Sequence, residues 1–397
     1  MQHPAPPSGT APIRLATTIR PYDWGSVTAL PRLFGTEPTG EPQAELWMGA
    51  HPGAPSTAGG VPLNELIAHD PAATLGAPAA DRFGPELPYL LKVLAVERPL
   101  SLQVHPTTEQ ARAGYAAENA RGIPLDDRTR TYKDASHKPE MVCALTPFHG
   151  LCGFRAPAAT AALLDRLGLP GLRPWIDALT DGEPEAALRR VFAEMLDDAA
   201  RPLRAGVERA LLEAVEDDEL AVYAGIARAY PGDPGIVAAL LLNHVDLAPG
   251  EALYLGAGVP HAYLGGIGVE IMANSDNVLR CGLTSKHVDV PELMRVVDFT
   301  PTAPHRVEPA EDPRGAYAYR PPAPEFALTR HELTGEHTHQ LPGGVPQIVL
   351  CVEGEARLGE DLTLRPGESA FVPAAAASVT LAGKGTAYRA EPGAFTL

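Results

Sequence analysis

The sequence predicts a mainly β protein that is interrupted by a block of α-helices. Short apolar runs divided by Gly and Pro fill residues 19–154, and the same texture returns at residue 252 and continues to the C-terminus. Such runs indicate β-strands separated by turns. Between them, residues 157–230 are rich in Ala, Leu, Arg and Glu. The change in texture predicts a helical insert within a β scaffold.

The first β segment contains three runs with strand character, at residues 46–48, 89–94 and 100–104. Two stretches within the same segment, residues 63–68 and 108–120, are expected to be helical. We predict that residues 1–154 form the first part of one domain.

Residues 155–243 are predicted to form the α-helical insert domain. Apolar residues at positions 188, 191, 192, 195 and 196 recur at the spacing of one helix face. Asp233-Pro234 supplies a cap and a first-turn proline for a further helix, expected at residues 235–242.

A short internal repeat links the two later β segments. Residues 247–255 resemble residues 364–372, because both place a Pro-Gly-Glu turn before an apolar strand. The same offset aligns Ser378 with His261, so the second copy lacks the imidazole. We therefore predict two related β-barrels, the second degenerate. Residues 244–320 would complete the first barrel and residues 321–397 would form the second.

The order of turn, strand, turn and His261 resembles the cupin barrel, a jelly roll whose inward-facing strand residues bind metal at the mouth. The predicted fold is thus two cupin-type (jelly-roll) β-barrels plus an α-helical domain.

Composition excludes several classes of partner. The chain has 49 acidic and 32 basic side chains and a formal net charge of −17, which disfavours binding to nucleic acid or anionic membranes. Its four cysteines form no CxxC pair, which indicates reduced core residues rather than disulfides. The N-terminal segment lacks the features of a signal peptide, and no apolar run is long enough to span a membrane. We expect a cytoplasmic monomer with neither nucleic acid nor a membrane as partner.

A scattered polar set predicts a metal site. Gln103 and His105 are two apart in an extended run, so their side chains face the same side. Glu140 and His261 would complete a shell of two nitrogens and two oxygens around a divalent ion. Zinc suits this shell best, with iron, manganese and cobalt as alternatives.

Cationic residues accompany this set. Lys92 interrupts an apolar strand, Lys138 is two residues from Glu140, and Arg280 has uncharged neighbours. A buried guanidinium needs an anionic partner, here either a structural carboxylate such as Asp276 or a bound phosphate or enediolate. The set as a whole predicts an anionic substrate.

Longer motifs resemble the type I phosphomannose isomerases (mannose-6-phosphate isomerases). The resemblance runs from about residue 13 to residue 300, and more faintly to the C-terminus. Its motifs include Pro21-Tyr22-Asp23-Trp24-Gly25, Glu45-Leu46-Trp47-Met48-Gly49, Leu102-Gln103-Val104-His105-Pro106, His137-Lys138-Pro139-Glu140-Met141, Phe148-His149-Gly150-Leu151-Cys152-Gly153-Phe154 and Ser275-Asp276-Asn277-Val278-Leu279-Arg280.

The resemblance implies an aldose–ketose isomerase with one Zn²⁺ per chain, which interconverts mannose 6-phosphate and fructose 6-phosphate through a cis-enediolate. Of the 13 histidines in the chain, it singles out His105 and His261 as ligands. The family's metal ligands fall on Gln103, His105, Glu140 and His261. Its other active-site residues fall on Lys92, Lys138, Arg280 and Lys286, with His137, Tyr263, Glu270 and Asp276 nearby.

In this reading the metal, Arg280 and Lys138 stabilise the developing oxyanion. The phosphate is expected on a combination of Lys92, Ser101, Arg280 and Lys286, with Tyr263 also contacting the substrate. The general base stays open among His137, Lys138, Glu270, Asp276 and a water held by the metal.

Two alternatives use the same shell of ligands. One is an iron-dependent cupin oxygenase, and the other is a non-catalytic sugar-binding cupin in which the metal only organises the pocket. The number of cations argues against simple sugar binding.

Overall fold

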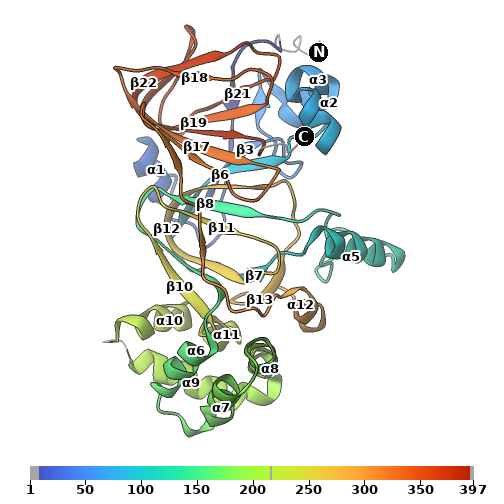
Figure 1. The fold of residues 1–397 in the computed structure, drawn as a ribbon, viewed down its shortest axis with the longest axis vertical. Coiled ribbons are helices and arrows are strands. Elements are labelled where there is room, and N and C mark those ends of the chain that lie inside the picture. Colours follow the sequence, from blue (N-terminus) through green and yellow to red (C-terminus); the bar gives the residue numbers. More distant parts are fainter. Residues whose placement is uncertain (1–8, 215–216, 394–397) are drawn as a thin grey trace.

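The computed structural model describes residues 9–214 and 217–393. The molecule is elongated, with two β-rich parts stacked along its long axis and a helical block at one end (Figure 1). Within the described residues the strands form two sheets of 11 strands each. The prediction of a mainly β protein with helices is therefore confirmed.

The first sheet, called the central sheet below, carries the candidate site. Its strands are β2 (Thr18–Arg20), β3 (Glu45–Gly49), β6 (Tyr89–Val96), β7 (Leu102–Val104), β8 (Glu140–Ala144), β9 (Phe148–Phe154), β10 (Leu242–Leu247), β11 (Ala252–Leu255), β12 (His261–Ala273), β13 (Leu279–Gly282) and β14 (His305–Arg306).

Strand β12 joins two groups of strands within the central sheet. Its first part pairs with β7 and β9, and its second part pairs with β6 and β8. Gly266 lies where the partners change, and its φ of 114° lies in a region that other residues rarely adopt. The residues at the start of β12 therefore face strands that are distant in sequence.

The second sheet, called the C-terminal sheet below, lies at the other end of the molecule from the helical block (Figure 1). Its strands are β1 (Ile13–Ala16), β4 (Thr57–Ala58), β5 (Val61–Pro62), β15 (Ala310–Asp312), β16 (Ala316–Tyr319), β17 (Ala327–Thr334), β18 (His339–Leu341), β19 (Gln347–Leu358), β20 (Leu362–Leu364), β21 (Ser369–Val372) and β22 (Val379–Glu391).

The predicted helical insert lies between β9 and β10. Its helices are α6 (Pro157–Asp165), α7 (Arg173–Asp181), α8 (Pro184–Leu196), α9 (Arg201–Glu213), α10 (Asp218–Ala229) and α11 (Gly235–Ala239). The apolar stripe of α8 is buried at Leu188, Val191, Phe192 and Met195. The helix expected at residues 235–242 ends at Ala239, because Leu242 already pairs with Phe154 as the first residue of β10.

The remaining helices surround the two sheets. They are α1 (Ala29–Phe34), α2 (Leu63–His69), α3 (Pro71–Leu75), α4 (Ala77–Phe83), α5 (Thr108–Ala120) and α12 (Val290–Val296). Helix α5 has the expected bounds because Thr107 and Gln110 form a capping box at its N-terminus.

The internal repeat corresponds to matching strands. The turn at Pro249-Gly250 leads into β11, and the turn at Pro366-Gly367 leads into β21. Strand β12 begins at His261, and β22 begins at Val379, directly after Ser378. Neither sheet closes into a barrel among the described strands, so the structure shows the mainly β character but not two separate barrels.

The predicted domain limits stay predictions, but one pairing crosses them. Strand β1, placed by sequence in the first domain, pairs with β21 of the C-terminal sheet. Short strands carry little periodicity, so their partners cannot be read from the sequence.

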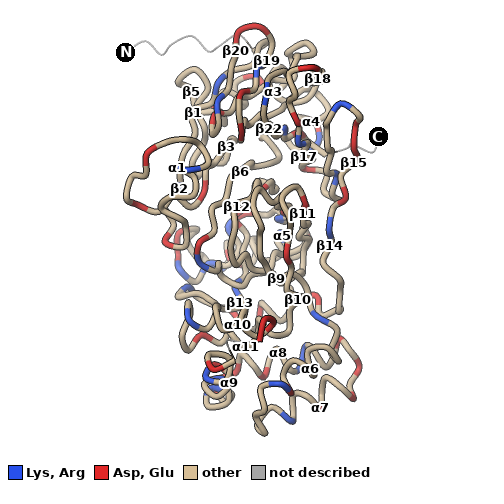
Figure 2. The backbone as a smooth tube through the Cα atoms, turned by 90° about the vertical axis from the view of Figure 1, so that its left-hand side faces the viewer, with Lys and Arg blue, Asp and Glu red and all other residues tan. Residues whose placement is uncertain are grey.

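Other expectations concern the surface and the cysteines. Cys143, Cys152, Cys281 and Cys351 are free and buried. None of the described helices has both the length and the apolar character that crossing a bilayer requires. Figure 2 shows Lys and Arg interspersed with Asp and Glu, without a large patch of one charge along the backbone.

Candidate active site

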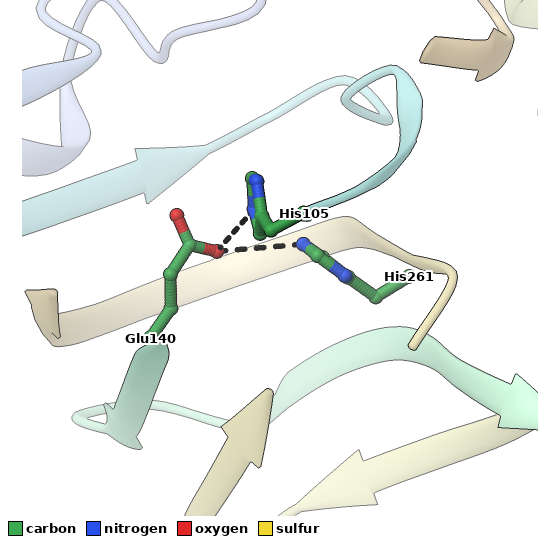
Figure 3. A group of neighbouring side chains, drawn as sticks. All are labelled: His105, Glu140 and His261. Atoms are coloured by element: carbon green, nitrogen blue, oxygen red, sulfur yellow. Dashed lines mark ion pairs between the residues drawn. The ribbon is translucent and has the colours of Figure 1, made fainter. Parts of the chain in front are cut away.

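Three predicted ligands meet inside the central sheet. Glu140 Oε2 lies 3.3 Å from His105 Nε2 and 3.4 Å from His261 Nε2 (Figure 3). All three residues are buried. The sheet brings them together because His261, at the start of β12, pairs with Gln103 on β7, while Glu140 pairs with Leu255, the last residue of the preceding strand β11.

The hydrogen bonds of the two imidazoles fix where their protons lie. His105 Nδ1 is 2.7 Å from the carbonyl oxygen of Asn277, and His261 Nδ1 is 2.9 Å from that of Val259. A carbonyl only accepts, so each Nδ1 is the donor and each Nε2 keeps a lone pair. Both lone pairs face Glu140, which is itself an acceptor when ionised.

A cation fits this arrangement. His105 Nε2 and Glu140 Oε2 are buried, and neither has a hydrogen-bond partner among the described residues. Buried polar atoms without partners are costly, and a metal ion would satisfy them. Ligand atoms bound tetrahedrally to zinc at about 2.0–2.1 Å lie about 3.3–3.4 Å from one another, which matches the separations here.

Gln103 is the fourth predicted ligand, and it lies beside the other three. Its Nε2 is 3.2 Å from His261 Nε2. A half-turn of the amide about its last bond exchanges nitrogen and oxygen with little change in shape. After that rotation the oxygen would face the same centre.

The charges around the metal ligands suit metal binding. Burial lowers the pKa of His105 to about 4, so its imidazole is neutral near pH 7. Burial alone would raise the pKa of Glu140, but Lys138 and His105 outweigh it and hold this pKa well below its usual range. Lys138 Nζ lies 2.8 Å from Glu140 Oε1, which leaves Oε2 for the metal.

A cavity of about 370 Å³ opens next to these ligands. Most of the predicted site residues line it, namely Lys92, Ser101, Gln103, Lys138, Glu140, Tyr263, Glu270, Asp276, Arg280 and Lys286. The cavity thus brings together residues from 92 to 286 in the sequence. It is large enough for a small phosphorylated sugar.

Lys92 lies in a buried network of carboxylates on one wall of the cavity. Its Nζ is 3.0 Å from Glu270 Oε2 and 3.5 Å from Glu45 Oε2. Burial would lower the pKa of Lys92, but Glu270, Glu45 and Glu140 outweigh it and raise this pKa, so the lysine stays charged. Burial, together with Glu140 and Glu45, raises the pKa of Glu270.

Among the residues that the structure describes, no carboxylate forms an ion pair with the Arg280 guanidinium. Asp276, the structural partner considered from the sequence, instead lies with its Oδ1 3.4 Å from His51 Nε2. Of the two alternatives, a bound anion is the one that the structure leaves for Arg280.

Lys286 lies on the same side of the cavity as Arg280. It lines the cavity with Arg280, and both residues also line an adjoining cavity of about 610 Å³. Burial and the neighbouring Arg280 lower the pKa of Lys286. Neither cation forms an ion pair within the described structure, so together they favour an anionic group between them at the mouth of the cavity.

One predicted catalytic residue lies apart from the others. His137 is not among the residues that line the cavity, and its Nε2 is 2.7 Å from Glu325 Oε1. A catalytic role for His137 stays a prediction without support from this geometry.

Three residues of the site were not assigned a role from sequence. Trp47 donates its indole N–H to Glu45, and Lys92 lies 5.2 Å from the centre of the Trp47 ring. His51 is buried behind Asp276. The alternation of Glu45 and Trp47 along one strand was a usable signal, whereas nothing in the local sequence connects His51 to Asp276.

Comparisons with known proteins agree with this site. Residues 13–157 match the family model described as phosphomannose isomerase type I, catalytic domain, and residues 321–392 match the model described as mannose-6-phosphate isomerase, cupin domain. The mannose-6-phosphate isomerase of Escherichia coli (strain K12) is 41% identical, over 95% of this chain and 98% of that protein. The chain belongs to the type I phosphomannose isomerases.

Other members of the family extend the agreement. The mannose-6-phosphate isomerase of Homo sapiens is 33% identical, over 89% of this chain and 90% of that protein. A solved mannose 6-phosphate isomerase, described as the zinc-bound holo form, has a TM-score of 0.90 and 38% identity, and the match covers 97% of this chain and all of that one. Neither the oxygenase nor the non-catalytic alternative is favoured by these relatives.

Proposed function

We propose that this protein interconverts mannose 6-phosphate and fructose 6-phosphate. The proposal depends on one observation: side chains that need a cation lie next to a side chain that needs an anion. The lone pairs of His105, His261 and Glu140 need a cation, and the unpaired Arg280 beside them needs an anion. A zinc ion and a phosphosugar would satisfy both.

Zinc would be held by Gln103, His105, Glu140 and His261. When bound, it would act as a Lewis acid that withdraws charge from the sugar oxygens at C1 and C2. The two backbone carbonyls behind the imidazoles keep both rings in the tautomer that presents Nε2.

The phosphate is assigned to the mouth of the cavity. Arg280 and Lys286 supply charge there, and Ser101 supplies a hydroxyl. Lys92 lies deeper and is already surrounded by carboxylates. We assign it to the sugar hydroxyls rather than to the phosphate, with Tyr263 on the same wall.

Proton transfer between C1 and C2 needs a base that lines the cavity. Of the residues predicted from sequence, Lys138, Glu270 and Asp276 meet this condition. Lys138, beside Glu140, is placed to stabilise the negative charge that develops on the enediolate oxygens. Burial raises the pKa of Glu270, which makes its ionised carboxylate a stronger base than an exposed glutamate.

We further propose that each sheet, with its connecting loops, forms a jelly roll of the cupin type. We also propose that the protein is a monomer in the cytoplasm. Light scattering of the purified protein at several concentrations tests the monomer, since a mass above that of one chain would contradict it.

The function is tested by incubating the protein with mannose 6-phosphate and measuring fructose 6-phosphate. We expect turnover that a chelator abolishes and added zinc restores. A protein that binds the sugar phosphate without converting it would instead support the non-catalytic alternative. Oxygen consumption by an iron-loaded protein would support the oxygenase.

A further inference from the structure

A second group of metal-ligating side chains lies on strands β9 and β10. His149 on β9 pairs directly with Asp246 on β10, and His244 precedes Asp246 by two residues. Alternate residues of a strand face the same side, so the three side chains share one face. Their ligand atoms all lie within 4.8 Å of one another.

The three side chains converge on one carboxylate oxygen. Asp246 Oδ1 lies 2.5 Å from His149 Nδ1 and 3.5 Å from His244 Nε2. The two rings are nearly parallel, with their centres 6.3 Å apart. His244 Nε2 is buried and has no hydrogen-bond partner among the described residues. An unsatisfied nitrogen therefore faces the oxygen that a metal would share.

The nearby arginines do not compete for this carboxylate. Arg306 lies 2.9 Å from Glu251 and donates to the backbone carbonyl of Asp246, not to its side chain. Arg155 lies 2.5 Å from Glu219. Within the described residues, the Asp246 carboxylate is thus paired with the two imidazoles and with neither arginine.

This group lies on a different face from the catalytic ligands. Leu151 and Leu242 share the outward face with His149 and His244, and both leucines belong to the apolar core of the helical insert. Val245 and Leu247, which alternate with His244 and Asp246, belong instead to the core that contains Tyr263. The His149 group is therefore on the side of β9 and β10 that carries the insert.

We propose that His149, His244 and Asp246 form a second site for a divalent transition metal, with Zn²⁺ as the fitting ion. Two imidazoles and one carboxylate suit zinc, whereas calcium and magnesium prefer oxygen ligands. Binding requires the proton on His149 Nδ1, which faces Asp246, to move to Nε2 of the same ring, and requires the two ligand atoms to separate by less than about 1 Å. Three protein ligands leave one position for water.

The proposed site lies on the two strands that connect the helical insert to the central sheet. Strand β9 leads into the helical insert and β10 leads out of it, and the two lie side by side (Figure 2). A metal bound by both strands would tie together the two connections of the insert. Binding to the folded state alone raises the stability of the protein.

The test is a titration of the holoenzyme, its catalytic zinc already in place, with Zn²⁺ by calorimetry. We expect one additional ion per chain and a rise in the melting temperature. His244→Ala and Asp246→Asn should each weaken this binding at least about ten-fold and remove the rise in melting temperature. Isomerase activity should stay at the wild-type level in both variants.

His69→Ala, which removes an exposed histidine outside the group, is the matched control and should bind the additional ion as the wild type does. The proposal is overturned if the holoenzyme takes up no further zinc. It is equally overturned if His244→Ala binds the additional ion as tightly as His69→Ala. Loss of activity in the His244 variant with unchanged zinc uptake would also contradict it.

Discussion

At the scale of residues, the site depends on where a few protons lie. Each imidazole donates to a backbone carbonyl, so two lone pairs and a carboxylate meet without a proton between them. Strand alternation predicted that Gln103 and His105 share a face. It could not predict which distant carboxylate faces them, because that depends on the pairing of β12 with β7 and β8.

Arg280 gives the first prediction at this scale. Arg280→Ala should lower kcat/KM by about 100-fold or more, because an unpaired guanidinium in the cavity is lost. Zinc content, measured by elemental analysis, should stay at the wild-type level. Arg357→Ala, which removes an exposed arginine, serves as the control. Undiminished turnover in the Arg280 variant would mean that Arg280 has a structural role and does not act on the substrate.

His331 gives a prediction about stability and pH. Both of its ring nitrogens are buried without a hydrogen-bond partner in the described chain. Burial, with Arg389 and His339 nearby, lowers its pKa to about 3. The unfolded state, with a pKa near 6.5, takes up a proton that the folded state refuses, so stability falls as pH drops below about 6.5.

The expected loss from His331 alone is about 2 kcal/mol between pH 7 and pH 5. The melting temperature of the His331→Leu variant should therefore fall less than that of the wild type between pH 7 and pH 5. His69→Leu should follow the wild type. An equal decline in wild type and His331→Leu would show that His331 does not resist protonation.

At the scale of elements, the helical insert supports the substrate cavity. Asp233, which precedes α11, accepts hydrogen bonds from the backbone N–H groups of Leu283 and Thr284. Leu283 has a φ of 55°, which is uncommon for a residue other than glycine. This turn lies between Arg280 and Lys286, so an insert residue holds the segment that carries both cations.

Asp233→Ala should therefore raise KM for mannose 6-phosphate more than it lowers kcat. Three backbone N–H groups, those of Gly235, Leu283 and Thr284, lose their acceptor and the turn relaxes, while the metal ligands are not touched. Steady-state kinetics with zinc analysis measures both effects. Asp233→Asn, which keeps one acceptor oxygen, should recover part of the loss. If the Asp233→Ala variant lost zinc as well as affinity for mannose 6-phosphate, the prediction that Asp233 supports only the substrate-binding turn would be wrong.

Much of the element order could be predicted from sequence because its signals are local. The capping box of α5, the apolar stripe of α8 and the turn before β11 are each encoded within a few residues. The early end of α11 could not be predicted, since it depends on the pairing of Leu242 with Phe154. The turn at Leu283 is likewise held by a residue 50 positions away.

At the scale of the whole molecule, the net charge of the chain has the same sign as the substrate that we propose. Its net charge is −17, yet the site binds an anion in our proposal. Lys92 and Lys138 are each matched to carboxylates, whereas Arg280 and Lys286 at the cavity mouth have no ion pair in the described structure. The unmatched cations lie where the phosphate would enter.

Raising the ionic strength should weaken this attraction. We expect KM for mannose 6-phosphate to rise with salt, while kcat changes little, because screening acts on the exposed charges at the mouth more than on the buried ligands. Kinetics across a sodium chloride series measures this. A KM that is independent of salt would argue against a phosphate held by Arg280 and Lys286.

A crystal structure of the zinc-loaded protein, with anomalous data collected at the zinc absorption edge, would show whether the four proposed ligands hold the ion. We expect an anomalous peak about 2.0–2.1 Å from both His105 Nε2 and His261 Nε2, with Glu140 and Gln103 completing the shell. An active, zinc-containing protein whose map shows no peak between these side chains would contradict this assignment.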